Sequence, residues 1–556
     1  MKKIYLLLFI IFSLFMKLSF AEEIKVDSSK VVVPNIKLLL LIDNKNDLKD
    51  VNISKLYGLN VVGVEIPGGI NQLKKELEPL FMHLSLTKKD ILELKEEIIL
   101  YYKRHNRPFV VVQIPPQNVS KGVLVLIVKE SKLEDVKVSS KWQDENRIKN
   151  YVRLKPSEPI DENLLLQDVN FINRNPFRRV DIIYSPGSKE YTTNVELAVQ
   201  DRFPLRVYTG AENTGLQYIG RQRWFAGFSW GNALHWDHVL SYQYTASYDC
   251  KGFQGHIVNY TALLPWRNVI NLFGGYSSVY ADNLEVISQT QDKGTSAQAS
   301  FRYVIPFFSF KKLSHELLLG FDYKTTNNTL EFVEQRPVFG NKANLTQFVL
   351  GYNLNYTLQK LITSFNLDIM VSPMRWLEDQ SNQSYSNLRY GADCKYTYGV
   401  ASLVSLFKLP HDFSFSILFK GQLSSKNLLP SEQLGVGGYN SVRGYYNRTL
   451  NGDDGFLVSI ETRSPPVNLL HHRMQGRVLD NIQFLAFIDY GLTREHKPEP
   501  SDVIDESDYL LSIGPGIRYV IDPYFSLRFD WGIRLHDKKE FPGSRQLIHF
   551  SVTAGY

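Results

Sequence analysis

Long apolar runs are scarce in this 556-residue chain once its N-terminal segment is passed. The best later candidate for a membrane-spanning helix, Val31 to Ile42, is interrupted by Pro34, Asn35 and Lys37. A spanning helix needs about 20 consecutive, mostly apolar residues. The sequence therefore excludes a protein that crosses a membrane as a bundle of helices.

Cysteine is scarce as well, with only Cys250 and Cys394. They give no disulfide framework, and no Cys/His cluster has the spacing of a metal site. An oxidising compartment would permit a bond between them, and the sequence leaves their pairing open. The chain also lacks a P-loop, a Ser/His/Asp order and a close pair of carboxylates. We therefore expect no enzyme activity, no cofactor and no metal.

The first residues have the pattern of an export signal. Lys2 and Lys3 form a basic start, Ile4 to Phe15 is apolar, and small residues stand one and three positions before a cut after Ala21. An uncleaved anchor is the alternative, but the apolar run is short for a spanning helix. Residues 1–21 are therefore predicted to be a signal peptide.

The mature chain is nearly neutral. Three of the 63 basic residues lie in the signal segment, which leaves 60 against 57 acidic residues, a net charge of +3. That balance argues against a nucleic-acid partner. Mean hydropathy is −0.20 and aromatic residues make up 13% of the chain. An exported chain of this kind fits a transmembrane β-barrel, although a large secreted β-protein would share the composition.

Residues 31–205 show one order of helix and strand patterns twice. In the first copy, apolar residues recur at three- and four-residue spacing from Lys88 to His105, and Thr87 offers an N-cap, which predicts a helix. The other elements predicted there are a helix at Asn71 to Phe81 and strands at Ile36 to Ile42, Phe109 to Ile114 and Val123 to Val128. The second copy has predicted strands at Lys132 to Val138, Val180 to Tyr184 and Asn194 to Val199, with helices at Asn146 to Leu154 and Asp161 to Asn173. A repeated β-α-α-β-β order predicts two small domains, at 22–130 and 131–205.

From Arg206 to the C-terminus the pattern changes to alternation, with no helical period. One face of a predicted strand is apolar and consists of Ile482, Phe484, Ala486, Ile488 and Tyr490. The other face consists of Gln483, Leu485, Phe487, Asp489 and Gly491. The final strand alternates in the same way, with Ile548, Phe550, Val552, Ala554 and Tyr556 on one face. Such strands suit lipid on one side and a polar lumen on the other.

The predicted barrel covers residues 206–556. These 351 residues allow about 16 tilted antiparallel strands at roughly 22 residues per strand and loop. An even number of strands closes the sheet, and lipid tolerates no unpaired edge. The expected fold is thus mainly β, with an α+β front half and a transmembrane antiparallel barrel.

One loop carries a specific motif. Gly437 to Tyr445 contains Val442-Arg443-Gly444-Tyr445, which resembles the VRGY loop motif of the two-partner secretion transporters, the TpsB family of haemolysin secretion/activation proteins. The other matching segments stand in the expected order and are Tyr101 to Gln117, Asn173 to Arg178, Glu212 to Gly215 and Phe487 to Gly491, the last matching an F-x-D-x-G strand. The resemblance covers nearly the whole mature chain.

The loop arginine needs a partner if the loop folds into the pore. A carboxylate can bind a guanidinium in bidentate fashion, which offsets the cost of removing it from water. Asp489 faces inward by the alternation above, and the resemblance implies that it pairs with Arg443. Glu461, on the predicted strand Val458–Arg463, is a second inward-facing candidate. The plain alternative is that Arg443 is a solvated loop residue.

The resemblance implies a function. In this family two periplasmic POTRA domains bind an unfolded secreted exoprotein, which crosses the barrel without nucleotide hydrolysis and folds outside as a β-helix. The implied location is the outer membrane, and the implied partners are the exoprotein, outer-membrane lipid and the machinery that inserts the barrel. Two other functions stay open, a factor that assembles other barrels and, less in keeping with the motifs, a diffusion porin.

Two features depart from the family pattern. Well-known members carry an N-terminal plug helix, whereas only about ten residues separate Ala21 from the first predicted strand here. A plug helix is therefore not expected, and the loop that contains Arg443 becomes the main obstruction of the pore. The second departure is a polar insertion from Asp43 to Leu59, to which the sequence assigns no role.

Four histidines could suggest a metal site. His235 and His238 flank Trp236 near a predicted strand end, where aromatic and polar tips are common at membrane interfaces. His471 and His472 follow two prolines in a predicted turn. We therefore expect none of them to bind a metal.

Overall fold

The computed structural model describes residues 30–48, 52–216, 219–280, 293–307, 312–329, 339–373, 375–470, 479–498, 507–539, 541 and 543–556. The predicted signal peptide, 1–21, lies outside them. Two compact units make up the chain. The first comprises the chain up to Lys137 with 154–165 and 183–196, and the second comprises 138–153, 166–182 and 197–556.

The first α/β region has two helices on one face of a sheet. Its elements are β1 (Val31–Val33), β2 (Leu38–Ile42), α2 (Ile70–Phe81), β4 (Leu86–Thr87), α3 (Lys88–Arg104), β5 (Val110–Gln113) and β6 (Val123–Glu130), so the predicted order is present. The helix α3 begins at a capping box, in which the side chains of Thr87 and Asp90 each accept a hydrogen bond from the other's backbone N–H. Its apolar stripe, including Ile98, Tyr101 and Tyr102, is buried in the core.

The polar insertion forms an additional edge of this sheet. It contains two short 3-10 helices, η1 (Lys45–Leu48) and η2 (Ile53–Lys55), and leads into β3 (Gly58–Val62), which pairs in parallel with β2. The sheet order is therefore β3-β2-β6-β5. Leu48, Ile53 and Leu56 pack on the sheet face away from the helices. All five residues of β2 are buried, which explains its unbroken apolar sequence.

The second α/β region repeats the arrangement without the additional strand. It consists of β7 (Lys132–Ser139), α4 (Glu145–Asn150), α5 (Glu162–Ile172), β8 (Arg178–Pro186) and β9 (Thr192–Asp201), with the sheet order β7-β9-β8. This matches β2-β6-β5 of the first region. The helix α4 ends before the predicted Leu154, because the Arg153 N–H bonds to the Asp168 carboxylate at 2.8 Å and draws the chain away. No helix in the described residues is long and apolar enough to cross a membrane.

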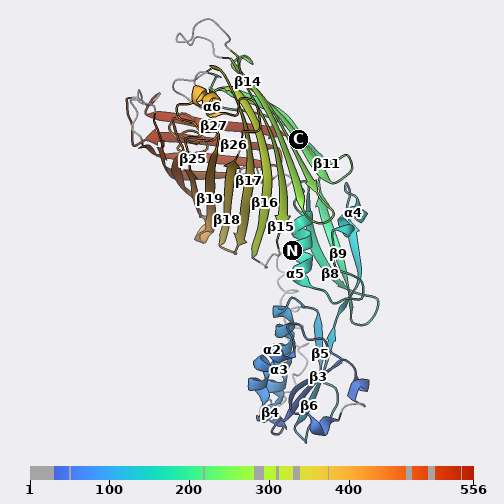
Figure 1. Cartoon of the computed structure of the whole chain (residues 1–556). Helices are drawn as coiled ribbons and strands as arrows, with labels where there is room; N and C mark the ends of the chain where they lie inside the picture. The colour runs from blue at the N-terminus through green and yellow to red at the C-terminus, as the bar shows by residue number, and fades with distance from the viewer. Residues whose placement is uncertain are drawn as a thin grey trace, which may run out of the picture. The chain divides into compact units, whose positions relative to one another are not determined.

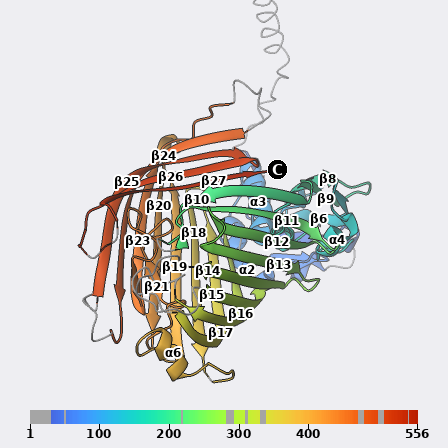
Figure 2. The same cartoon turned by 90° about the horizontal axis from the view of Figure 1, so that it is seen from above.

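Sixteen strands among the described residues form a closed antiparallel barrel, which confirms the predicted fold (Figures 1 and 2). They are β10 (Leu205–Glu212), β11 (Arg223–Ala233), β12 (His238–Ser247), β13 (Phe253–Leu263), β14 (Val269–Tyr280), β15 (Lys293–Pro306), β16 (Leu313–Asn328), β17 (Phe339–Thr357), β18 (Leu361–Ser372), β19 (Tyr396–Lys408), β20 (Ser414–Ser424), β23 (Asp454–Arg463), β24 (Leu479–Arg494), β25 (Ser507–Asp522), β26 (Phe525–Arg534) and β27 (Gln546–Gly555). The first and last strands pair from Tyr208 with Gly555 to Glu212 with Ser551, so the sheet has no open edge.

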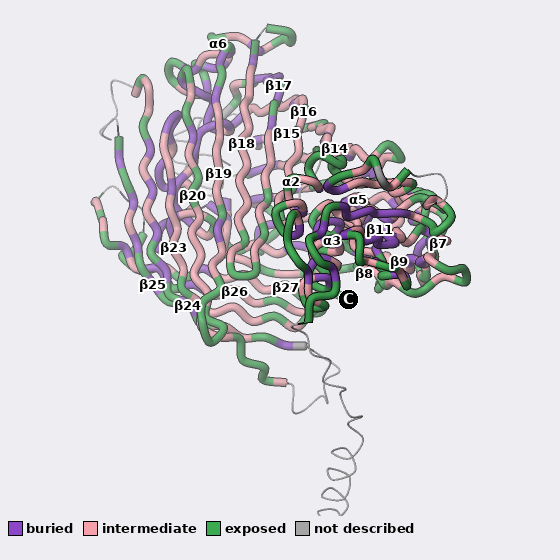
Figure 3. The backbone as a smooth tube through the Cα atoms, turned by 90° about the horizontal axis from the view of Figure 1, so that it is seen from below, coloured by how far each residue is buried: buried purple, intermediate pink, exposed green. Residues whose placement is uncertain are grey.

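The two faces of the wall differ as the alternation predicts. On β24, Phe484 and Ile488 are exposed on the outside, whereas Asp489 is fully buried on the inside. Most of the wall has intermediate exposure (Figure 3). Most turns at the end where β10 begins, which we call the near end, are short, as between β17 and β18, where three residues connect the strands; the connection from β23 to β24, residues 464–478, is longer. The opposite end, the far end, carries the longer loops.

A helix in one far-end loop contradicts the prediction that no helix follows Arg206. This helix, α6 (Asn382–Leu388), lies between β18 and β19. Ser381 caps it by accepting a hydrogen bond from the Ser384 N–H, and Tyr385 and Leu388 are buried beneath it. Two turns are too few for an apolar period to be visible in the sequence. A 3-10 turn, η4 (Pro410–Asp412), joins β19 to β20 at the near end.

The capping box gives a test of the first region. Thr87→Ala removes the side-chain acceptor, and we expect α3 to lose about 1 kcal/mol of stability. Faster hydrogen exchange of the α3 amides in the full chain would measure this loss. Lys89→Ala is the control, because its exposed pair with Glu93 contributes only about 0.3–0.5 kcal/mol. Equal exchange in Thr87→Ala and the parent would contradict the prediction.

The same box predicts a pH dependence. The backbone N–H of Thr87 holds the pKa of Asp90 below its ordinary value. A carboxylate with a lowered pKa stabilises the fold above the pKa of the unfolded chain, and this stability is lost as the pH falls through the lower folded-state pKa. Protection of the α3 amides against hydrogen exchange should therefore decrease as the pH falls through that window. The decrease should be smaller in Asp90→Asn than in the parent, because asparagine does not titrate.

Candidate functional site in the barrel lumen

The loop between β20 and β23, residues 425–453, lies within the ring of strands (Figure 2). We call it the lumen loop. Two short strands, β21 (Leu434–Val436) and β22 (Leu450–Gly452), pair antiparallel and hold its two limbs together. The predicted motif is at the tip, where Val442 and Tyr445 are fully buried in an apolar cluster. The tip is thus packed against the wall.

Arg443 is the centre of a buried ion network. Its Nε and Nη2 donate to the two carboxylate oxygens of Asp489, each at 2.7 Å, and its backbone N–H donates to the same carboxylate at 3.0 Å. Nη1 donates to Glu461 at 2.6 Å, and Nη2 also reaches Ser459 at 3.1 Å. Arg443 is 2% exposed, so the solvated-loop alternative is wrong.

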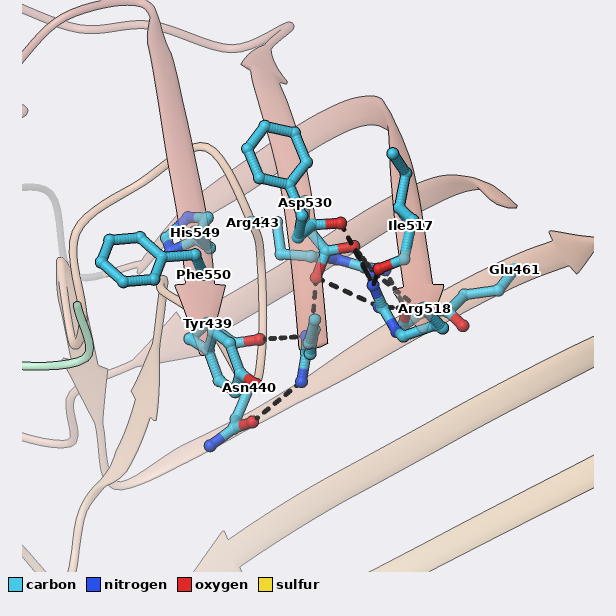
Figure 4. A network of polar contacts seen from close by, with 12 residues as sticks. Tyr439, Asn440, Arg443, Glu461, Ile517, Arg518, Asp530, His549 and Phe550 are labelled. Carbon is cyan, nitrogen blue, oxygen red and sulfur yellow. Dashed lines mark hydrogen bonds and ion pairs between the residues drawn. The ribbon is translucent and has the colours of Figure 1, made fainter. Parts of the chain in front are cut away.

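Asp530 on β26 extends this network to two further arginines (Figure 4). The fully buried carboxylate accepts from Arg518 at 2.8 and 3.1 Å and from Arg528 at 2.8 Å, and Arg443 lies 3.4 Å away. Arg528 also donates to the Tyr439 carbonyl at 2.6 Å. Strands β23 to β26 therefore all contribute to holding the loop tip.

The phenylalanine and the glycines of the two motifs allow the loop tip to lie close to the wall. The Phe487 ring lies beneath the loop guanidinium, with its centroid 3.5 Å from the guanidinium carbon. Gly444 has a φ of 90°, and a Cβ there would lie 2.9 Å from the backbone of Gly532. A Cβ at Gly491 would lie 2.3 Å from a methyl group of Val436. Side chains at either glycine would push the loop from the wall.

The inner part of the network is balanced in charge. Arg443, Arg518 and Arg528 face Asp489, Glu461 and Asp530, so three positive groups meet three negative groups there, and the more exposed Arg463 adds a fourth arginine at Glu461. Bringing such groups out of water is costly, and mutual pairing offsets most of the cost. Losing one partner leaves an uncompensated buried charge, which costs about 3–5 kcal/mol in measured cases.

Sequence reasoning missed part of this network. Asp530, Arg518, Arg528 and Ser459 were not among the predicted site residues. A signal was present, because Arg528 and Asp530 alternate with apolar residues on one strand and so must face the lumen. The alternation does not show that Asp530, on β26 two strands from β24, reaches the same loop arginine as Asp489.

The segment Asn173 to Arg178 binds a near-end turn of the barrel. Arg178, whose side chain is fully buried, donates from both Nη atoms to Asp237, at 2.6 and 2.8 Å. Asn175 donates to Asp237 at 2.8 Å and to the Gly231 carbonyl at 2.7 Å. A Cβ at Gly231 would lie 2.0 Å from the Phe177 ring. These contacts attach this segment to the turn between β11 and β12.

The turn between β13 and β14 makes a second buried contact of this kind. Arg267, in that turn, pairs with the fully buried Asp168 of α5. The same carboxylate accepts from Arg153 Nε at 2.8 Å. Two neighbouring near-end turns therefore carry charged partners for the segments 138–153 and 166–182.

The histidines and cysteines have ordinary surroundings. His238 lies 2.5 Å from the Tyr260 hydroxyl, and His235 lies in the turn before it; His471 and His472 are outside the described residues. No group of three or more potential metal ligands occurs in the part of the chain that the structure describes. Both cysteines are described and free, Cys250 exposed and Cys394 buried.

A closed barrel with a charged loop anchored in its lumen, preceded by an α/β region, defines an outer-membrane β-barrel transporter. A sequence profile described as "Haemolysin secretion/activation protein ShlB/FhaC/HecB" matches residues 192–519. This is more than half of the chain. The chain belongs to this family of two-partner secretion transporters and is not an enzyme, which confirms the class predicted from the loop motif.

Individual relatives agree with this assignment. The chain is 21% identical over 471 residues to the "Heme/hemopexin transporter protein HuxB" of Haemophilus influenzae (strain 86-028NP), covering 81% of this chain and 80% of the relative. It is 23% identical to the "Outer membrane transporter CdiB" of Dickeya dadantii (strain 3937), covering 69% and 67%. The solved structure of CdiB from Escherichia coli has the same fold, with a TM-score of 0.76, 15% identity and coverage of 97% and 93%.

A substitution that keeps the charge tests the geometry of the loop anchor. Lysine at position 443 is a single point charge and cannot form the two-pronged contact with Asp489. We expect Arg443→Lys to raise hydrogen exchange at the loop tip about tenfold or more, because charged hydrogen bonds contribute about 1.5–3 kcal/mol each. Arg463→Lys is the control, since it touches only the outer side of Glu461. An unchanged tip in Arg443→Lys would count against the anchor.

Proposed function

We propose that this barrel exports a large secreted partner protein, of the β-helical adhesin or haemolysin type, from the periplasm at the near end to the cell surface at the far end. The observation that carries the proposal is the buried pairing of Arg443 with Asp489, which holds a loop inside a closed barrel. Short near-end turns and long far-end loops support the orientation.

The partner first meets the α/β region, which we propose to be two periplasmic POTRA domains at 22–130 and 131–205. Strand addition to an open sheet edge suits an unfolded client, because main-chain bonds tolerate many sequences. In the first region β3 occupies the edge beside β2, and no strand of the described residues pairs with the outer edge of β5. The outer edge of β3 is open in the same sense, and of the two we propose Val110–Gln113 for the client, since its side chains alternate between buried and exposed.

A client can pass through the barrel only if the lumen loop moves away from its resting position. We propose that Arg443, Gly444 and their neighbours hold it in place in the resting barrel, with Asp489, Glu461, Phe487 and Gly491 as the matching wall. Folding of the client outside the cell would make its return unfavourable, so no nucleotide is needed. Lipid around the outer face and the machinery that inserts barrels are the remaining partners. Among relatives, the printed names refer to heme/hemopexin and to hemolysin, which supports a secreted client of that class.

Quantitative proteomics of the medium and the outer membrane, with and without this gene, tests the function. Loss of one large protein from the medium, with its accumulation or degradation in the periplasm, is the expected result. Depletion of many outer-membrane barrels would contradict export and point to an assembly factor. No change in either fraction would contradict both and direct the next measurement to solute flux.

Point variants test the role of the anchor in export. Arg443→Ala and Asp489→Ala should each reduce export at least about tenfold while the barrel remains in the membrane, because each leaves buried charges unpaired. Asp489→Asn should be milder, since Glu461 and Asp530 still face the arginine. The exchanged pair Arg443→Asp with Asp489→Arg should not restore export, because the new carboxylate would face those same two acids. Normal export by both alanine variants would contradict the role.

A further inference from the structure

A second cluster of charges holds the lumen loop, away from the Arg443 network. Glu432 is 4% exposed, and its carboxylate accepts from Lys324 Nζ at 2.7 Å and from the Tyr398 hydroxyl at 2.7 Å. Gln347 donates to it at 3.3 Å. These partners come from β16, β19 and β17. The part of the lumen loop before β21, residues 425–433, which we call the first limb, is therefore bound to three strands of the wall.

The two attachments lie far apart on the barrel. Lys324 is on β16 and Asp489 is on β24, six strands further along the ring of sixteen. Gln347, which donates to Asp322 at 3.0 Å, continues the first cluster along the wall. The lumen loop is therefore fastened at two separated parts of the wall and crosses the lumen between them.

The limb that carries Glu432 also packs against the far-end helix α6. Leu428 and Leu429 pack with Tyr385 and Leu388 beneath α6 in one apolar cluster. Arg389, which follows α6, donates from both Nη atoms to Asp453 at the end of the loop, at 2.7 and 3.0 Å. The helix thus joins both ends of the lumen loop.

A cavity of about 410 Å³ lies beside this limb. Leu429 and Ser431 of the loop form part of its lining, together with Lys324 on the wall. Movement of the limb away from β16 would therefore enlarge a space that already exists.

We propose that Glu432 is a positioning residue for export, which fixes the first limb of the lumen loop against β16 and β19 and separates from Lys324 when a client passes. The inference rests on the function proposed above. Leu429, Tyr396 and Tyr398 would accommodate an apolar side chain here, so packing alone does not require a charge. A buried ion pair contributes little net stability. Its advantage is that both groups become hydrated when the limb leaves, whereas separated apolar surfaces would adhere to an unfolded client.

Conductance of the purified full-length protein in planar bilayers tests the pair without a client. Glu432→Gln and Lys324→Gln should each raise the fraction of time spent open about tenfold, because each leaves one buried partner uncompensated. The double variant should open no more than either single variant, as expected for two residues that act on each other. Single variants that conduct like the parent, or effects that add in the double variant, would overturn the proposal.

The controls separate a positioning role from loss of the barrel. Lys408→Gln removes an exposed lysine at the near end of β19, ten residues along the strand from Tyr398, and should leave conductance within about twofold of the parent. Heat-modifiable migration on gels and the amount in the outer membrane should match the parent for all variants. A change in either would overturn a role confined to positioning. Absence of client export by the parent protein would contradict the proposed function. Unchanged conductance of Glu432→Gln would contradict only the role of Glu432.

Discussion

Closure of the sheet is the constraint on which the rest of this molecule depends. Lipid offers no hydrogen bonds, so the pairing of β10 with β27 is what allows sixteen strands to reside in a membrane at all. Closure also encloses a lumen, and the lumen loop occupies part of it. Because the inner wall is polar, the loop is held chiefly by charges and only locally by apolar contacts.

This choice of contacts has a physical rationale. The Arg443 network and the Glu432 cluster are both buried and each is internally paired, so neither leaves an isolated charge in the closed lumen. When water or a chain enters, the same groups can be solvated. An apolar plug of equal area would hold as well at rest, but it would expose a surface to which an unfolded client binds without specificity.

The sequence was sufficient wherever a local pattern determines a local structure. Thr87 as an N-cap predicted the start of α3, and alternation along β24 placed Asp489 inside the barrel. The sequence was insufficient where pairing between distant segments decides. Asp530 becomes part of the site only because β26 lies two strands from β24, and Glu432 is significant only because the loop folds back to β16. The strand β3 was missed because its apolar residues are few and follow a polar stretch, although its parallel pairing with β2 covers an edge and a face of the sheet. The borders of the proposed POTRA domains and the roles of the site residues stay predictions.

The free cysteines have a practical consequence. Cys250 lies exposed in a far-end turn, whereas Cys394 is fully buried under α6, against the limb of the lumen loop. With the far end at the cell surface, as proposed above, a thiol reagent that cannot cross the membrane would label Cys250 in resting barrels and Cys394 only where the packing under α6 has opened. Cys250 is thus an internal standard and Cys394 a reporter. The ratio of the two labels on living cells would measure the fraction of barrels in which the packing under α6 has opened.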